Sequence, residues 1–258
     1  MTSWAAWKQP SKKRESSVSL YFSPIQDEFS ETLLGFLYSS IYAQRTAERL
    51  YIFDTKDMIQ PFFQKTPNSE FVKESPSSGT NLALSLHQTA PILQSLRVST
   101  LKSYSKSLFQ YNEVTRNKIQ TFLSAFPILK QTFDVGIVLD TSGCVTQVLS
   151  GLSAYQKRTG KKSLRVFVMT DQLDLLREFA TKGDRSWTYA SLLSSQPILD
   201  KQSQYIKTLS DITIMQQIDF LAFRFSSSTG KLLYLLNQQV SSENEVLSLD
   251  GTSWKAFS

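Results

Sequence analysis

The segment Leu209–Leu236 constrains the fold of this chain more than any other stretch. Its sequence, LSDITIMQQIDFLAFRFSSSTGKLLYLL, predicts a helix, a short buried strand, a serine turn and a second helix. Asp211 and Asp219 flank the apolar face of the first helix, and Phe220–Phe223 is the strand. The turn Ser226–Ser228 opens the second helix, where backbone N–H groups and hydroxyls suit a phosphate. The segment therefore predicts a β/α unit with a nucleotide-binding crevice.

The second half of the chain continues this pattern of alternating strands and helices. Asp134–Leu139 and Leu164–Met169 have the continuous apolar character of buried parallel strands. The helices expected after them are Thr146–Arg158 and Leu173–Phe179, and Val246–Leu249 is a last short strand. The order of elements predicts a parallel sheet of the α/β class.

The first half predicts a second, smaller α/β unit. A strand over Ser16–Phe22, a helix over Glu28–Arg45 and a strand over Leu50–Phe53 give the order β-α-β, which is typical of a parallel sheet. We expect a brief helix over Asp57–Phe63. Thr66–Thr80 is rich in Pro, Ser and Gly and predicts a loop.

A long helix over Thr100–Phe122 closes the first half, and the stretch around Pro127 predicts the connection to the second. The expected organisation is a basic tail over residues 1–16, a reduced N-terminal α/β domain over 17–130 and a C-terminal Rossmann-like domain over 131–258. A basic partner-binding face on the long helix is one interpretation, and a solvated face is the other.

Composition excludes several classes of protein. No apolar run reaches the roughly 18 residues that cross a bilayer, and the N-terminus lacks the apolar core of a secretory signal. The single cysteine, Cys144, cannot form an internal disulfide, which is typical of a reducing compartment. We therefore expect a soluble intracellular protein, cytoplasmic unless the basic tail is an organellar presequence.

The net charge of +6 is concentrated at the N-terminus, where Lys8, Lys12, Lys13 and Arg14 less Glu15 give +3. This tail is either a solvated leader or a contact for an acidic partner, RNA or a membrane surface.

The remaining motifs of common sites are missing from the sequence. His87 is the only histidine, and no CxxC, GxGxxG or GxxxxGK[ST] motif occurs, so neither a metal nor a P-loop is expected. A basic adaptor for nucleic acid would rest on the tail and on Thr100–Phe122 alone.

Four segments resemble a known family in the same order along the chain. They are Asp134–Leu139, Val166–Asp171 (VFVMTD, similar to V-x-x-A-T-D-D), Asp211–Lys231 (similar to D-I-x-x-L-x-x-A-D-x-x-V-x-T-F-S-S) and Leu247–Asp250 (LSLD, similar to H-S-L-D-D). The chain thereby resembles the GT-B fucosyltransferases that include the α-1,6-, nodulation and protein O-fucosyltransferases. This resemblance implies two facing Rossmann-like α/β domains with parallel sheets, the N-terminal one reduced.

The resemblance also implies roles for individual residues. Asp211 would contact the nucleotide of GDP or GDP-fucose, Ser226 and Ser227 would bind its diphosphate, and Asp171 would lie beside the guanine or ribose. The alternative for Asp211 and the serines is helix capping without any ligand. The acceptor would be a glycan or a protein.

The chain departs from the family where the transfer chemistry lies. The family's first strand of this half leads into H-x-R-R-x-D-K, and the first Arg stabilises the leaving diphosphate. The corresponding positions for His, Arg, Arg and Lys are here Val138, Asp140, Thr141 and Cys144. A carboxylate in place of that Arg opposes the developing negative charge. In addition, Gln172 replaces the second Asp of T-D-D.

Arg224 stands where the family has Thr, and it has three interpretations. It pairs with Asp140 and fills the donor pocket, or Arg224 or Lys231 replaces the lost cation, or Arg224 is simply solvent-exposed. We expect a fucosyltransferase-like protein that has lost transfer activity and serves as a structural or interaction subunit. The alternative is an active glycosyltransferase that uses GDP-fucose or a related nucleotide sugar.

Overall fold

The computed structural model describes most of the second half of the chain and the main elements of the first. All structural statements concern residues 20–22, 28–46, 49–52, 54, 58–64, 69–72, 80–81, 93–126, 132–193, 200–241 and 245–254. In this part of the chain, none of the helices is both long enough and apolar enough to cross a bilayer.

The first half contains a four-stranded parallel sheet. Its order is β3-β2-β1-β4, and its strands are β1 (Leu20–Phe22), β2 (Leu50–Ile52), β3 (Ser69–Phe71) and β4 (Thr80–Asn81). Helix α1 (Phe29–Thr46) connects β1 to β2, as the β-α-β pattern predicts. The start of the first expected strand, residues 16–19, lies outside the described residues.

Two predictions for this half are wrong. The expected loop over Thr66–Thr80 contains β3, which pairs with β2 from Leu50↔Ser69 onward. The expected helix over Asp57–Phe63 is a set of turns in the described residues 58–64. The Asp54 carboxylate accepts the N–H groups of Met58, Ile59 and Gln60 at 2.6–2.9 Å, so it holds these amides in a turn in place of a helical ladder.

The long helix expected over Thr100–Phe122 is two helices, α3 (Val98–Leu108) and α4 (Glu113–Ser124). The break has a local cause, because Asn112 caps α4 by accepting the N–H of Thr115 at 2.8 Å. Between the helices, Tyr111 forms an antiparallel bridge with Phe63. The apolar periodicity continues across the break, which is why the pattern alone predicts one helix.

The second half forms a five-stranded parallel sheet in the order β7-β6-β5-β8-β9. Four of its strands match the predicted positions: β5 (Val135–Val138), β6 (Arg165–Met169), β8 (Phe220–Phe223) and β9 (Val246–Ser248). The edge strand β7 (Thr188–Ala190) is one that the sequence pattern does not reveal, because it has only three residues and only one of them is buried. The helices of this half are α5 (Val145–Thr159), α6 (Leu173–Lys182), α7 (Lys201–Met215) and α8 (Ser228–Leu236).

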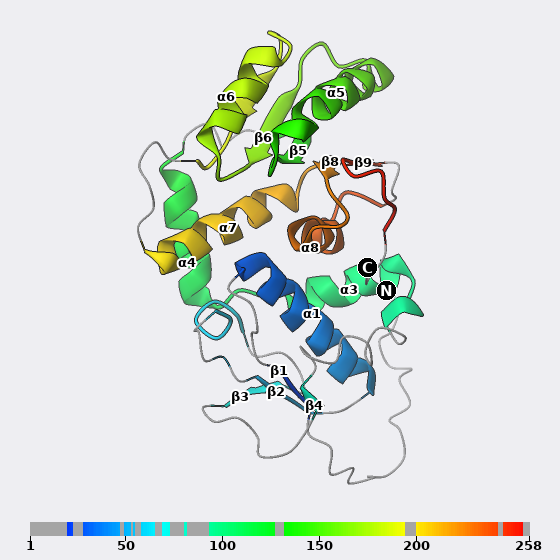
Figure 1. Ribbon diagram of the computed structural model, residues 1–258. Helices are drawn as coiled ribbons and strands as arrows, with labels where there is room; N and C mark the ends of the chain where they lie inside the picture. The colour runs from blue at the N-terminus through cyan, green and yellow to red at the C-terminus, as the bar shows by residue number, and fades with distance from the viewer. Residues whose placement is uncertain are drawn as a thin grey trace, which may run out of the picture.

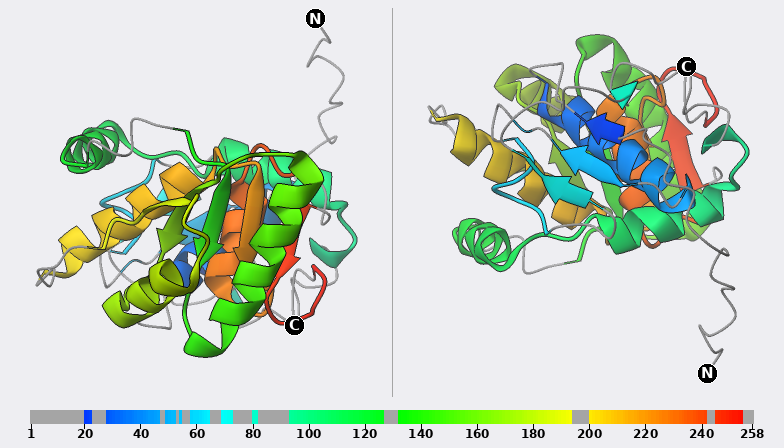
Figure 2. Two further views of the ribbon diagram at one scale, coloured as in Figure 1. Left: turned by 90° about the horizontal axis from the view of Figure 1, so that it is seen from above. Right: turned by 90° about the horizontal axis from the view of Figure 1, so that it is seen from below.

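The elements are stacked in layers (Figure 1). Helices α5 and α6 cover one face of the second sheet, and α7 and α8 cover the other. Helices α1 and α3 follow beneath α8, and the first sheet lies beyond them; Figure 2 shows these faces from above and from below.

One hydrophobic cluster joins the two halves of the chain. It contains Leu33 and Leu37 of α1 together with Leu232 and Leu235 of α8, all buried. A second cluster lies between the second sheet and α5 and α6. The division into domains 17–130 and 131–258 stays a prediction, and the packing shows a core shared across it.

Candidate functional site

The order in which the chain adds strands to the second sheet reverses between β5 and β8. From the central strand β5 the chain adds β6 and β7 on one side, then returns to add β8 and β9 on the other. In an open parallel sheet, such a switch point leaves a crevice outside the carboxyl ends of the strands. Here a cavity of about 870 Å³ lies at these ends, lined also by the first turn of α1, by α7 and by the start of α8.

Asp140 and Arg224 form an ion pair at the switch point. Asp140 lies two residues beyond β5 and Arg224 lies directly after β8, and the register Ile137↔Ala222 brings these strand ends together. Arg224 Nη2 is 2.5 Å from Asp140 Oδ1, and Nε donates to the same oxygen at 3.2 Å. Nη2 also donates to Thr141 Oγ1 at 3.1 Å. The pairing of Arg224 with Asp140 is therefore observed, but the expectation that Arg224 fills the donor pocket is not borne out, because a cavity of about 870 Å³ remains and Arg224 is not among the residues that line it.

The serine turn before α8 is present, and its groups bond within the protein. Ser227 caps α8, because its Oγ accepts the N–H of Gly230 at 3.0 Å and donates to the carbonyl of Arg224 at 2.9 Å. The N–H of Ser226 donates to Asp250 Oδ2 at 2.8 Å. The capping interpretation of Ser227 is thus correct in geometry, and phosphate binding by either serine stays a prediction.

Asp250 places a negative charge beside the serine turn. Its carboxylate accepts hydrogen bonds from the hydroxyls of Ser248 and Thr252, both at 2.8 Å. Burial by itself raises the pKa of Asp250, but the bonds from Ser226, Thr252 and Ser248 outweigh it and hold the pKa well below the ordinary value. The carboxylate of Asp250 therefore accepts the hydrogen bond from the Ser226 N–H, for which the sequence predicts a bound phosphate.

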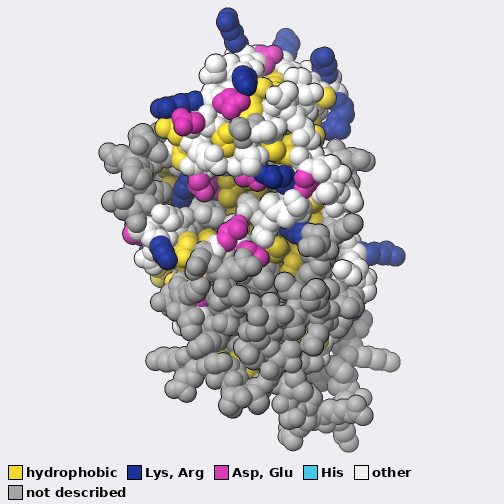
Figure 3. Space-filling view, viewed as in Figure 1, with side chains coloured by type: hydrophobic (Ala, Val, Ile, Leu, Met, Phe, Trp, Pro, Cys, Tyr) yellow, Lys and Arg dark blue, Asp and Glu magenta, His cyan; other side chains and the backbone are white. Residues whose placement is uncertain are grey.

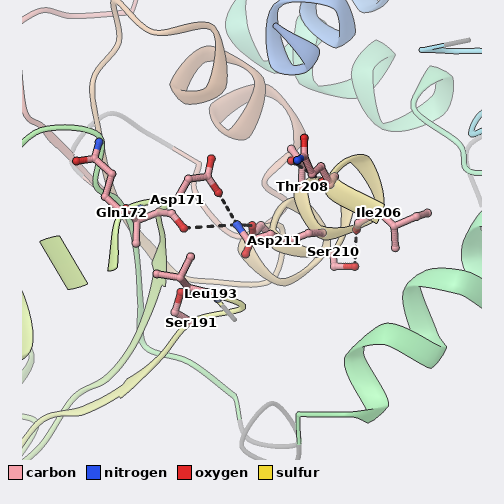
Figure 4. Close-up of polar contacts among 11 residues, drawn as sticks. Asp171, Gln172, Ser191, Leu193, Ile206, Thr208, Ser210 and Asp211 are labelled. Atoms are coloured by element: carbon pink, nitrogen blue, oxygen red, sulfur yellow. Dashed lines mark hydrogen bonds and ion pairs between the residues drawn. The ribbon is translucent and has the colours of Figure 1, made fainter. Parts of the chain in front are cut away.

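Lys207 lies between two carboxylates that line the same cavity, those of Asp171 and Asp211, which Figure 4 labels. Lys207 and Asp211 are one turn apart on α7, and Asp171 follows β6. Lys207 Nζ is 2.8 Å from Asp171 Oδ1 and 3.1 Å from Asp211 Oδ2. The lysine side chain is 9% exposed and that of Asp211 is 1% exposed, whereas that of Asp171 is 90% exposed. The two predicted nucleotide contacts, Asp171 and Asp211, are thus brought together by a residue that was not predicted.

Burial and neighbouring charges act against each other in this trio. Burial raises the pKa of Asp211, the nearby Lys207 ammonium lowers it, and the resulting pKa is about 7. For Lys207, burial lowers the pKa, but Asp211 and Asp171 outweigh it and hold the pKa above its ordinary value. Asp211 Oδ1 is buried and finds no hydrogen-bond partner within the described ranges. Asp211 therefore changes its charge close to neutral pH.

Asp219 is not part of the site, although the sequence placed it beside Asp211 on one helix. Helix α7 ends at Met215, and Asp219 is exposed just before β8. The buried side chain of Asn237 ends the helix, because its Nδ2 donates to the carbonyls of Met215 and Ile218 at 2.7 and 2.8 Å. This long-range cap has no local sequence pattern.

The structure also places Lys207, Lys231 and Gln172 relative to the cavity. Lys207 was missed, although its i, i+4 spacing from Asp211 on a predicted helix is a recognisable pairing pattern. Lys231, one of the alternative cations, is buried on α8, and burial lowers its pKa. Lys231 does not line the cavity that Asp140 and Lys207 line. Gln172 lines it and donates to the carbonyl of Asp140 at 2.9 Å.

Comparison with known proteins gives structural matches but no sequence matches. No family model and no curated protein sequence matches the chain. Among solved structures, the Arabidopsis thaliana FUT1 R284K mutant in complex with GDP matches with a TM-score of 0.56 at 10% identity, over 85% of this chain and 68% of that one. The α-1,6-fucosyltransferase NodZ soaked with GDP-fucose matches with a TM-score of 0.54 at 12% identity, over 85% and 92% of the two chains.

This protein has a fucosyltransferase-like GT-B fold. POFUT1 in complex with GDP supports the same conclusion, with a TM-score of 0.51 at 11% identity over 87% of this chain and 96% of that one. The predicted α/β class with parallel sheets is confirmed. The cavity lies outside the carboxyl ends of β5 and β6, where ligands bind in open parallel sheets. Among the described residues, no group of His, Cys, Asp and Glu is arranged to hold a metal ion.

Proposed function

We propose that this protein is a fucosyltransferase-like protein that has lost transfer activity and serves as a structural or interaction subunit. The observation that carries the proposal is the ion pair between Asp140 and Arg224, at 2.5 Å, beside the cavity. Asp140 stands at the position that corresponds to the catalytic Arg in the resembled family. Its carboxylate accepts hydrogen bonds from the guanidinium of Arg224, which follows the neighbouring strand.

Charge is the physical reason. Transfer from a nucleotide sugar leaves negative charge on the diphosphate, and enzymes meet this charge with fixed donors and cations. Asp140 has the opposite sign, and Arg224 is already bonded to Asp140 and Thr141. The amide of Ser226 is bonded to Asp250. A diphosphate would have to displace these internal carboxylates while it is repelled by them.

The proposed role as a subunit follows from the combination of a preserved fucosyltransferase-like fold and a lost transfer activity. A layered fold with a shared buried core offers stable surfaces to other proteins without any reaction. The proposed location is inside the cell, and it is supported by the one cysteine, Cys144, which is free and buried.

An active glycosyltransferase is the second candidate, and two observations favour it. The cavity is still about 870 Å³, which is large enough for a small-molecule ligand. The ammonium of Lys207 lies on its wall and is bound to the exposed Asp171, which a ligand anion can displace. Lys207, rather than Arg224 or Lys231, would then be the replacement cation for GDP-fucose.

Ligand binding separates the two candidates. Thermal shift and calorimetry with GDP and GDP-fucose are compared for the unmodified protein, Asp140→Arg and a control, Asp174→Arg. Asp174 is 97% exposed on α6 and pairs only with Arg177 among the contacts seen, so the control makes the same change of charge outside the cavity. We expect no binding by the unmodified protein and a gain of GDP affinity in Asp140→Arg alone. Submillimolar binding of GDP by the unmodified protein would contradict the loss of activity.

A further inference from the structure

The walls of the switch-point cavity carry an excess of negative charge. Among the described residues that line the cavity, four bear carboxylates and one bears an ammonium group: Glu28, Asp140, Asp171, Asp211 and Lys207. With Arg224 included behind Asp140, carboxylates still outnumber cations by four to two. Figure 3 shows acidic side chains, with basic ones among them, in the middle of this face. Such walls repel an anion and attract a cation.

A buried acceptor lies within this acidic wall. Asp211 is 1% exposed, and its Oδ1 finds no hydrogen-bond partner in the described part of the chain. Buried carboxylate oxygens are ordinarily bonded, so an unbonded one in a residue that lines the cavity favours a ligand that donates hydrogen bonds. Asp171, which is 90% exposed, lies at the outer end of the same trio. The wall thus has a deep and an outer carboxylate, joined by Lys207 (Figure 4).

An aromatic pair also lines the cavity. Phe29 of α1 and Tyr205 of α7 stack with ring centroids 4.1 Å apart and an angle of 18° between their planes. Both rings line the cavity next to Glu28. Aromatic faces attract organic cations, and a neighbouring carboxylate adds to that attraction.

We propose that this cavity binds an organic cation, an alkylammonium or guanidinium group carried by a small amine or by a basic side chain of a partner protein. The cation donates to the carboxylates of Asp171 and Asp211 and lies against the Phe29–Tyr205 stack. This inference rests on the proposed loss of nucleotide-sugar binding, because both ligands would occupy the same space.

The charge of Asp211 gives this binding a pH dependence of known sign. The groups that face the site are Glu28 from α1, Asp140 and Asp171 from the strand ends, and Lys207 and Asp211 from α7. Asp211 loses its proton near a pKa of about 7, and a bound cation favours the ionised form. The affinity for a cation therefore rises as the pH increases through neutrality, whereas the affinity for an anion falls.

Calorimetry on the full chain tests the proposal with agmatine and with the peptide acetyl-Gly-Arg-Gly-amide. The same peptide with citrulline in place of arginine is the uncharged match. We expect the arginine peptide or agmatine to bind at least about tenfold more tightly than the citrulline peptide. Tighter binding of agmatine identifies a small amine as the source, and tighter binding of the arginine peptide identifies a protein side chain.

Two variants locate the binding. Asp171→Asn is expected to lower the affinity for the cationic probe about fivefold or more, whereas Asp174→Asn, outside the cavity, leaves that affinity unchanged. Asp211→Asn is expected to remove the rise in affinity between about pH 6 and about pH 8. Equal affinity for the arginine and citrulline peptides, with no agmatine binding, overturns this inference and leaves the proposed function intact. Tight GDP binding overturns both.

Discussion

At the scale of single residues, Asp140 and Arg224 form a coupled pair of departures from the resembled family. Each substitution alone would place an unmatched charge at the carboxyl end of a buried strand. Together they form an ion pair with Nη2–Oδ1 at 2.5 Å and a further bond to Thr141. The side chain of Arg224 is 29% exposed and that of Asp140 is 40% exposed, so the pair is partly solvated and its contribution to stability is modest.

A double-mutant cycle tests this pairing. Urea unfolding of Asp140→Asn, Arg224→Met and the double variant is expected to give a coupling energy of up to about 1 kcal/mol. The coupling should decrease as salt is added, because the pair is reached by solvent. Strictly additive single effects at low salt would show that the two side chains do not interact in solution.

Asp211 makes the stability of the protein depend on pH. Its pKa is about 7 in the folded chain against an ordinary value of 3.8. Between these values the folded protein holds a proton that the unfolded chain has lost, so the free energy of unfolding falls as the pH rises from about 4 to about 7. The loss is complete above pH 7.

The variant Asp211→Asn cannot ionise, and it is expected to lack this decline. The measurement is the urea midpoint at several pH values, with Asp174→Asn as a control that keeps the wild-type slope. An unchanged slope in Asp211→Asn would show that another group accounts for the pH dependence.

At the scale of elements, the β8–turn–α8 unit is the part of the fold that local pattern predicts best. Phe220–Phe223 is a strand with the predicted bounds, and Ser227 is the cap of the next helix. A buried apolar run and a serine cap are local features, so the sequence contains them directly. The end of α7 depends on the cap by Asn237, which comes from a distant segment, whereas α4 begins at the local cap by Asn112.

Gly230 fixes the close approach of α8 to β8. A Cβ at this position would lie 2.1 Å from the carbonyl oxygen of Arg224, which is backbone and cannot turn aside. Gly230→Ala is therefore expected to lower the free energy of unfolding by about 1–3 kcal/mol. Gly143→Ala is the control, because a Cβ there meets nothing within 4 Å. Equal stability of the two variants in urea would contradict the close packing.

The candidate site was predictable only in part for the same reason. The resemblance to the fucosyltransferase motifs indicates Asp140, Asp171, Asp211 and Arg224 in the sequence. It does not indicate that Asp250 binds the Ser226 amide, because that contact joins β9 to the turn after β8. Nor does it indicate that Asp211 is buried, because burial depends on how distant segments pack.

At the scale of the whole molecule, the two sheets are held apart by helices that share one core. Residues of α1, α3, α7 and α8 belong to a single hydrophobic cluster, so neither half buries its helices without the other. The layered arrangement keeps the cavity walls together, because α1 and α7 supply the aromatic stack and the switch point supplies the acidic edge.

The shared core predicts that damage in the first half weakens the second. Leu37→Ala removes a fully buried side chain from α1 and is expected to cost about 2–5 kcal/mol. Native-state hydrogen exchange should show a matching loss of protection for the amides of β5 in the second sheet. Val114→Ala, at a side chain that is 62% exposed on α4, is the control. Unchanged protection of β5 in Leu37→Ala would show that the halves unfold independently.

Calorimetric titration of the unmodified full chain with GDP tests the central claim most directly, because the claim is that Asp140 and its partners exclude a diphosphate from the switch-point cavity. The account predicts no heat of binding with GDP up to about 1 mM at neutral pH. A saturable isotherm with a submillimolar Kd would contradict it.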